Sequence, residues 1–301
     1  MTTDNFKYKS RFWAISFLLL MISASAQNKE EINPDRHKKD VDNFIAFSNF
    51  IEAKRYNFND FEQLKNIDLQ LVWWMPLGSR IQGIKFGGYT SIQFLIVKTG
   101  SEIIYLEAGL NSNETKILDS LASINKKLRE RMRLWQHEKV KINESIWGVE
   151  LLYRYKNHKA LNRLYRFLDK KYGPKDSVEI KDKEMMKHYR ILMYPTYVYP
   201  YAGRYGYPPQ IPKGRKAMEY LVKHKRFDLL NNVLKGYNPE GKVYAIEALA
   251  KENKITAENL KSIRFLVANG GMIQSMVGCL PEYLTYKDII NKIFEEYQIN
   301  R

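Results

Sequence analysis

Apolar residues recur at two different periods along the chain, and the period typical of strands begins at Ile67. Three short runs there are rich in β-branched and aromatic residues and are separated by glycines: IDLQLVWWM, YTSIQFLIVK and SEIIYLEA. This pattern predicts three strands. Thr99 and Gly100, which lie between the second and third runs, predict a tight hairpin turn between antiparallel strands.

The middle run is apolar on both of its faces. Ile92, Phe94 and Ile96 point to one side of a strand, whereas Leu95 and Val97 point to the other. A strand with two apolar faces needs cover on both. We therefore expect this strand at the centre of a small antiparallel sheet.

Helical spacing surrounds the predicted strands. Residues 35–54, which follow Pro34, predict an N-terminal helix. Asn111 and Glu114 resemble a capping box, and apolar residues then recur at three- and four-residue steps: Ile117, Leu121, Ile124, Leu128, Met132 and Trp135. We predict one helix over 111–135 that covers the sheet and exposes Lys126, Lys127, Arg129, Arg131 and Arg133. These elements define a predicted α+β module at residues 27–140.

Helical periodicity predominates over residues 141–301. Ile146, Val149, Leu152 and Tyr153 predict a first helix, and later apolar sets predict helices near 161–172, 217–222, 227–234, 243–249, 260–267 and 286–297. Short connections would join them as antiparallel pairs. The expected fold class is α+β, mostly α, with a small antiparallel sheet packed on a long helix and followed by an irregular α-solenoid-like helical region.

A segment rich in tyrosine and proline, which we call the strap (residues 193–213), interrupts the helical pattern. Its five prolines exclude a regular helix and favour an extended backbone. We favour an interpretation in which the tyrosine rings fill a groove between helix pairs. The alternative is a platform for a sugar, a peptide or a proline. The candidate ligand-binding residues of that platform are Tyr197, Tyr199, Tyr201, Arg204, Tyr205 and Tyr207.

One stretch of the helical region resembles a known repeat family. The sequence GKVYAIEALAKENKITAENLKSIRFLVANGG, residues 241–271, has an alanine-rich first helix and a second helix that ends in glycine, and it resembles a HEAT-like repeat. The resemblance covers about residues 213–271, with a poorer echo at 143–173. It implies a binding or scaffolding surface rather than a reaction.

The N-terminus carries a targeting pattern. Lys7, Lys9 and Arg11 precede an apolar run at residues 12–23, and Ala24-Ser25-Ala26 follows it. This order is typical of a secretory signal peptide that is cleaved after Ala26. A signal anchor is the alternative, but a helix over this run reaches about 18 Å, less than the ~30 Å of a hydrocarbon core. We expect residues 1–26 to be removed and the remaining chain to be soluble, without an integral membrane span, and periplasmic or secreted.

Charge and cysteine content narrow the choice of partner. The chain has 49 Lys and Arg against 33 Asp and Glu, a formal net charge of +16. In an exported protein this charge favours anionic lipid surfaces, polysaccharides and wall polymers, and it makes nucleic acid an unexpected partner. The alternative is that the lysines solvate helix faces. Cys279 is the one cysteine, so no intramolecular disulfide forms, which favours a bacterial envelope.

Motifs for catalysis or metal binding are weak. GYNPEGKV has the spacing of a phosphate loop, but Val243 replaces the hydroxyl residue and Pro239 removes an amide, so we interpret it as a turn between helices. The five histidines show no metal-ligand pairing at i+3 or i+4. We interpret Cys279 as a small core residue, and Glu184 with His188 as a solvated pair. No metal site and no cofactor are predicted.

The sequence favours a binding role over catalysis. We expect an exported soluble binding or scaffold protein of a bacterial envelope, with a glycan, a wall polymer or an envelope protein as its partner. The alternative is an envelope-polymer hydrolase whose acid and base residues the sequence does not identify. A third hypothesis is weak association of the basic surface with anionic lipid headgroups.

Overall fold

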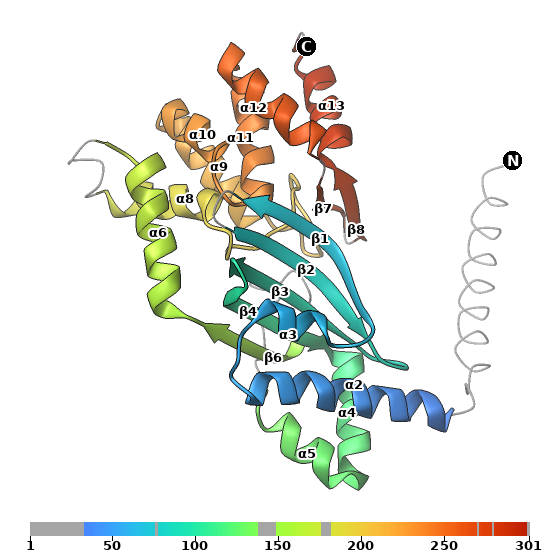
Figure 1. Cartoon of the computed structure of the whole chain (residues 1–301). Helices are drawn as coiled ribbons and strands as arrows, with labels where there is room; N and C mark the ends of the chain where they lie inside the picture. Colours follow the sequence, from blue (N-terminus) through green and yellow to red (C-terminus); the bar gives the residue numbers. More distant parts are fainter. Residues whose placement is uncertain are drawn as a thin grey trace, which may run out of the picture.

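The computed structural model describes residues 33–75, 78–137, 149–175, 182–269, 271–278 and 280–299. The predicted signal peptide, Cys279 and the module boundary predicted near residue 140 lie outside these residues. Helices pack on both sides of one antiparallel sheet (Figure 1), which confirms the expected α+β, mostly α fold class. None of the described helices combines the length and the apolar character that crossing a bilayer requires.

The sheet has six strands in the described part of the chain, in the order β1-β2-β3-β4-β6-β5. The strands are β1 (Ile67–Met75), β2 (Gly78–Phe86), β3 (Ser91–Thr99), β4 (Glu102–Asn111), β5 (Gln136–His137) and β6 (Val149–Lys156), and neighbours are antiparallel. The three predicted strands correspond to β1, β3 and β4. Gly100 forms the predicted turn between β3 and β4 with a φ of 57°, which glycine adopts at little cost.

β3 is an interior strand, as predicted, and its two faces belong to two different hydrophobic cores. Ile92, Phe94 and Ile96 pack in a core with the N-terminal helices. Leu95 and Val97 pack in a second core with the C-terminal helices. In Figure 1 the sheet accordingly lies between helices α2, α4 and α5 below and helices α8 to α13 above.

The N-terminal cover consists of α2 (Pro34–Glu52), α3 (Phe58–Glu62), α4 (Ser112–Ile124) and α5 (Lys126–Met132). The capping box of Asn111 and Glu114 is present at the start of α4. The prediction of one helix over 111–135 is wrong, because Asn125 has an extended backbone and separates α4 from α5. The Asn125 side chain accepts a hydrogen bond from the Leu128 amide, so it caps a new helix instead of continuing the old one.

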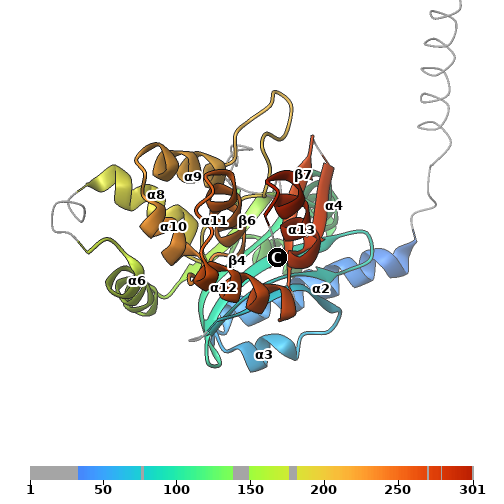
Figure 2. The same ribbon diagram turned by 90° about the horizontal axis from the view of Figure 1, so that it is seen from above.

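The C-terminal region is mostly helical, which is consistent with the expected repeat-like organisation. Its helices are α6 (His158–Tyr172), α8 (Lys183–Met193), α9 (Lys213–Lys223), α10 (Phe227–Val233), α11 (Pro239–Lys251), α12 (Ala257–Ala268) and α13 (Tyr286–Glu296). α11 is buried along most of its length and contacts α8, α9, α10 and α13. Figure 2, seen from above, shows α11 among the other helices of this region.

Five strands in the described part of the chain were not predicted from the sequence, and one of them is the two-residue strand β5. The helix predicted near Val149 is wrong, because this segment forms β6 and pairs with β4, whose backbone groups would otherwise lack partners. β2 is rich in glycine and charge, with Arg80 and Lys85 buried in it. A hairpin of β7 (Met272–Val277) and β8 (Leu280–Thr285) lies between α12 and α13.

A buried ion pair joins the sheet to the helical region. The Arg80 guanidinium of β2 and the Glu240 carboxylate of α11 are 2.7 Å apart, and neither side chain is exposed to solvent. Burial raises the pKa of Glu240 above its usual value, and the charge of Arg80 opposes that rise. The contact spans 160 residues of sequence and fixes α11 against β2.

Candidate functional site

The strap leaves α8, passes along the β7–β8 hairpin and returns to α9. The Tyr201 amide donates to the Gln274 carbonyl of β7 over 2.8 Å, and the Met276 amide donates to the Tyr201 carbonyl over 3.3 Å. The strap therefore runs parallel to β7 at this point. Figure 2 shows the segment between α8 and α9 as a loop that rises from the body of the molecule.

Three tyrosines of the strap point into the protein. Tyr199 is 3% exposed, and its hydroxyl donates to the Ile191 carbonyl over 2.8 Å. The buried Tyr194 stacks on Tyr165 with 3.9 Å between ring centroids. The Tyr201 hydroxyl donates to the Glu247 carboxylate over 2.8 Å. Burial and the charge of Glu247 raise the pKa of Tyr201, so its hydroxyl stays protonated. These rings pack in the interior, as the interpretation of a structural strap expects for them.

The other end of the strap is exposed and closed on itself. Tyr205 and Gln210 exchange two backbone hydrogen bonds of 2.9 and 2.8 Å, which hold the intervening residues as a turn. Tyr205 is half-buried, whereas Arg204 and Tyr207 are exposed. Tyr197 lies earlier in the strap and is 37% exposed. A ligand could therefore reach Arg204 and Tyr207 directly.

The exposed turn lies against the end of the hairpin. The Gly206 amide donates to the Gly278 carbonyl over 2.9 Å. This contact places the turn that carries Tyr207 beside the turn that Val277 and Leu280 flank. All three side chains are exposed, Tyr207 at 93%, Val277 at 66% and Leu280 at 73%. We call these three residues the strap–hairpin tip. They come from two segments about 70 residues apart in sequence, and backbone hydrogen bonds hold those segments in place.

The structure thus divides the six predicted binding residues. Tyr205, Tyr207 and Arg204 lie at or beside the tip, and Tyr197 lies apart from it. Tyr199 and Tyr201 are removed from the candidate binding residues, because their rings pack in the interior and their hydroxyls have protein partners. Val277 and Leu280 were missed. Their signal was an apolar pair around Gly278, a turn residue, in the stretch MVGCLPE.

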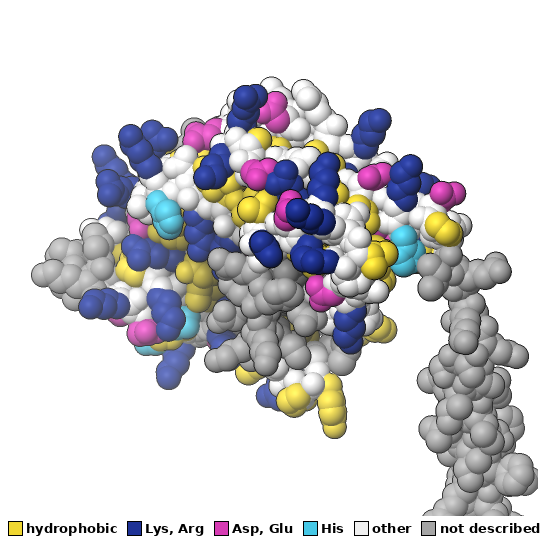
Figure 3. Space-filling view, turned by 90° about the horizontal axis from the view of Figure 1, so that it is seen from below, with side chains coloured by type: hydrophobic (Ala, Val, Ile, Leu, Met, Phe, Trp, Pro, Cys, Tyr) yellow, Lys and Arg dark blue, Asp and Glu magenta, His cyan; other side chains and the backbone are white. Residues whose placement is uncertain are grey.

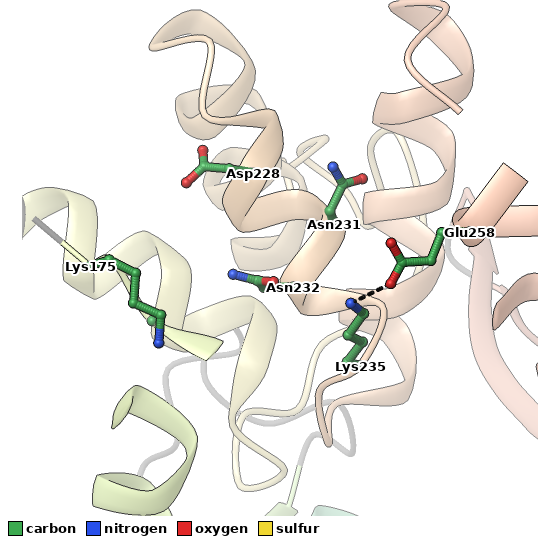
Figure 4. Close-up of a pocket in the computed structure, with 7 residues that line it drawn as sticks. Lys175, Asp228, Asn231, Asn232, Lys235 and Glu258 are labelled. Carbon is green, nitrogen blue, oxygen red and sulfur yellow. Dashed lines mark hydrogen bonds and ion pairs between the residues drawn. The ribbon is translucent and has the colours of Figure 1, made fainter. Parts of the chain in front are cut away.

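A polar hollow of about 660 Å³, separate from the tip, lies among α6, α10 and α12 (Figure 4). Its lining includes Lys175, Asp228, Asn231, Asn232, Lys235 and Glu258. Lys235 forms an ion pair of 2.8 Å with Glu258, and the Asn232 amide group donates to the Tyr172 carbonyl over 2.8 Å. These contacts tie the three helices together. The lining therefore has a structural role, and the hollow is a weaker candidate than the tip.

The remaining sequence motifs have structural roles. GYNPEGKV is the turn into α11, as predicted, and the Asn238 side chain caps that helix at the Gly241 amide. Glu184 and His188 lie on one face of α8, 3.7 Å apart. The His188 ring stacks on Tyr220, and burial lowers its pKa. Among the described residues, no three His, Cys, Asp or Glu side chains gather where a metal ion could bind.

Comparisons of the chain with protein-family models, with curated proteins and with solved structures found no match. The functional argument therefore depends on the geometry of the chain itself.

Proposed function

We propose that the protein is an exported binding or scaffold protein of a bacterial envelope, and that it holds its partner at the strap–hairpin tip. The partner class is a glycan, a wall polymer or an envelope protein. One observation carries this proposal. Tyr207, Val277 and Leu280 form an exposed apolar tip on a framework of backbone hydrogen bonds.

Rigidity makes the tip suitable for recognition. The turn at 205–210 is closed by its own hydrogen bonds and is fixed to the hairpin, so binding would cost little conformational entropy. A tyrosine ring has few rotatable bonds and offers an apolar face together with a hydroxyl group, which suits stacking on a sugar or a proline. Arg204, which is exposed beside the tip, adds a donor for acidic or hydroxyl groups.

The inward-pointing tyrosines hold the strap, and with it the tip, in place on α11. Tyr201 and Arg215 both bind the Glu247 carboxylate of α11, with hydrogen bonds of 2.8 and 2.5 Å. The Tyr244 hydroxyl donates toward the strap carbonyls of Pro200 and Ala202 over 2.9 and 3.0 Å. These contacts anchor the strap on the most buried helix of the region. We interpret the inner half of the strap as an anchor and its outer half as the binding surface.

The test is a thermal-shift and direct-binding screen of the protein against envelope polysaccharides, peptidoglycan fragments and envelope extracts. For a ligand found in this way, Tyr207→Ala should weaken binding by about 2 kcal/mol, as expected for an exposed aromatic anchor. Val277→Ser with Leu280→Ser should weaken it as well. The melting temperature should change little, because these side chains are exposed.

Phe265→Ala is the matched control. Phe265 is an exposed aromatic residue of α12, 67% exposed, and it does not belong to the tip. Its loss should leave binding unchanged. Equal affinity of the wild-type protein and the Tyr207→Ala variant for every ligand found would contradict the proposal.

A further inference from the structure

A second exposed surface lies at the junction of α4 and α5, at the lowest point of the molecule in Figure 1. α4 ends at Ile124, Asn125 forms the break, and α5 begins at Lys126. We call the exposed residues of this junction the basic corner: Ile124, Lys126, Lys127, Arg129 and Arg133. It is separate from the strap–hairpin tip and does not depend on the proposed function.

The corner carries a concentrated positive charge. Lys126, Lys127 and Arg133 are exposed on α5 and the residue after it. The Arg129 guanidinium donates to two carbonyls in the last turn of α4, those of Ala122 and Ser123, over 3.0 and 2.6 Å. This contact neutralises no acidic group, so the charge of Arg129 stays at the surface.

Acidic groups compensate little of this charge. Arg131 is engaged by Glu52 of α2, so its charge is balanced within the protein. Glu130 is the one acidic residue in the sequence of α5, and it is exposed. Figure 3, which views the molecule from below, shows Lys and Arg side chains prevailing over Asp and Glu on this face.

An aliphatic side chain stands among these charges. Ile124 is 86% exposed, more than any other valine, leucine or isoleucine of the described residues. It occupies the last position of α4, beside the two lysines that open α5. A soluble polyanion would gain from the lysines and arginines but not from an exposed isoleucine. An anionic bilayer would gain from both, because its headgroups attract the cations and its interface accepts the aliphatic group.

We propose that the basic corner binds the surface of an anionic lipid bilayer, with Ile124 entering the interface and Lys126 and Lys127 meeting the headgroup phosphates. Long lysine side chains suit this geometry, because their methylene groups can lie along the interface while the ammonium groups stay in water. The attachment is peripheral and reversible. It would hold the protein at a membrane while leaving the strap–hairpin tip on a separate part of the surface.

The experiment measures co-sedimentation of the chain from Gln27 onward, which retains every described residue, with vesicles. One set is phosphatidylcholine alone and the other contains equal parts of phosphatidylcholine and phosphatidylglycerol. The wild-type protein should bind the anionic vesicles and not the neutral ones. Lys126→Glu with Lys127→Glu should weaken binding by roughly 30-fold or more, because each cation near an anionic surface contributes about 1 kcal/mol.

The variants are chosen so that folding is preserved. Glu at the first two positions of α5 interacts favourably with the helix dipole, so the double variant should not lose stability. Ile124→Ser removes an exposed side chain and should weaken vesicle binding several-fold. Lys261→Glu with Lys287→Glu is the matched control, because it makes the same charge change on α12 and α13, at the opposite end of the molecule (Figure 1).

Three results would overturn the proposal. The first is no binding of the wild-type protein to anionic vesicles. The second is an equal loss of binding in the control variant, which would make the effect one of net charge and not of this corner. The third is a pair of results: Ile124→Ser binds vesicles as the wild type does, and Lys126→Glu with Lys127→Glu loses as much affinity for heparin as for vesicles. That result would show a general polyanion site instead of a lipid site.

Discussion

Lys85 places an ammonium group in the interior of the N-terminal half. The residue is 2% exposed, and its Nζ donates to the Lys65 carbonyl over 2.5 Å. Burial lowers the pKa of Lys85 to about 8. A lowered pKa means that the folded state disfavours the charged form, so the charge of Lys85 opposes folding at neutral pH.

Lys85→Met should therefore stabilise the protein at pH 7, by about 1 to 2 kcal/mol. This is less than the full pKa difference would give, because the bond to Lys65 is lost. The sign also predicts a pH dependence. The unfolded chain binds this proton up to about pH 10, so wild-type stability should rise, relative to the variant, between about pH 8 and pH 10.

Urea unfolding of both proteins across that pH range measures the difference. Lys98→Met is a suitable control, because Lys98 is a partly exposed lysine of β3 in the same sheet. A Lys85→Met variant less stable than wild type at pH 7, or a constant difference across the range, would contradict the argument.

The tyrosines of the strap show what sequence can predict for single residues. Alternation in an extended segment predicted that some rings point inward and others outward. It could not predict which rings did so, because the inward ones are selected by partners far along the chain. Tyr201 is fixed by Glu247 and by the edge of β7, and neither contact has a local signal. Val277 and Leu280 did have a local signal at Gly278, but it does not show that they are exposed, because their exposure depends on the hairpin.

Single elements were predicted well where the local pattern and the tertiary environment agree. The strands β1, β3 and β4 and the capping box at Asn111 are of this kind. β6 shows the opposite case. Its apolar positions fit a helix as well as a strand, and the choice is made by the unpaired edge of β4. Asn125 had a local signal, since asparagine favours a helix N-cap, but the uninterrupted apolar spacing concealed it.

The contact between α8 and α11 gives a prediction at the scale of elements. Gly241 lies in the first turn of α11, and a Cβ atom there would be 2.0 Å from the Leu192 carbonyl oxygen. No side-chain adjustment can relieve a clash with backbone, so the two helices would have to separate. Gly241→Ala should therefore lower the free energy of unfolding by about 3 kcal/mol.

Gly203→Ala provides the matched control. A Cβ atom at Gly203 would meet no atom within 4 Å, so this change should be close to neutral. Melting temperatures of both variants test the idea. The same comparison tests why position 241 is a glycine. If Gly241 is needed for helix packing, Gly241→Ala should lower stability strongly. If it were needed only to bind phosphate, Gly241→Ala should lower stability little.

At the scale of the molecule, the sheet is a layer shared by two cores. Ile92 and Phe94 pack in the N-terminal core, and Leu95 and Val97 pack in the C-terminal core. The double-faced apolar pattern of β3 predicted cover on both sides, and this part of the architecture could be read from sequence. The identity of the second cover could not, because it depends on contacts such as that of Arg80 with Glu240, which no local pattern marks.

The buried ion pair that joins the two halves gives a prediction about the stability of the whole molecule. The Arg80–Glu240 pair is inaccessible to solvent on both sides and joins β2 to α11. Arg80→Met leaves the Glu240 carboxylate buried without its cation, which should lower the free energy of unfolding by about 3 to 5 kcal/mol. Arg80→Met with Glu240→Leu removes both charges and should recover most of that loss. Lys187→Ala, which breaks an exposed pair with Glu184, should cost less than about 1 kcal/mol.

The pH dependence of the single variant adds a sharper test. Without Arg80, burial should raise the pKa of Glu240 further, and a raised pKa in the folded state means that stability is lost as the pH rises. Arg80→Met should therefore be less destabilising at about pH 5 than at about pH 8, whereas the double variant should show no such difference. Circular dichroism follows both halves of the protein, and tryptophan fluorescence reports on the N-terminal half, because Trp73, Trp74 and Trp135 lie there. Coincident transitions in every variant would support one cooperative unit. If the helices of the Arg80→Met variant unfolded first while the sheet persisted, the ion pair alone would join two independent halves.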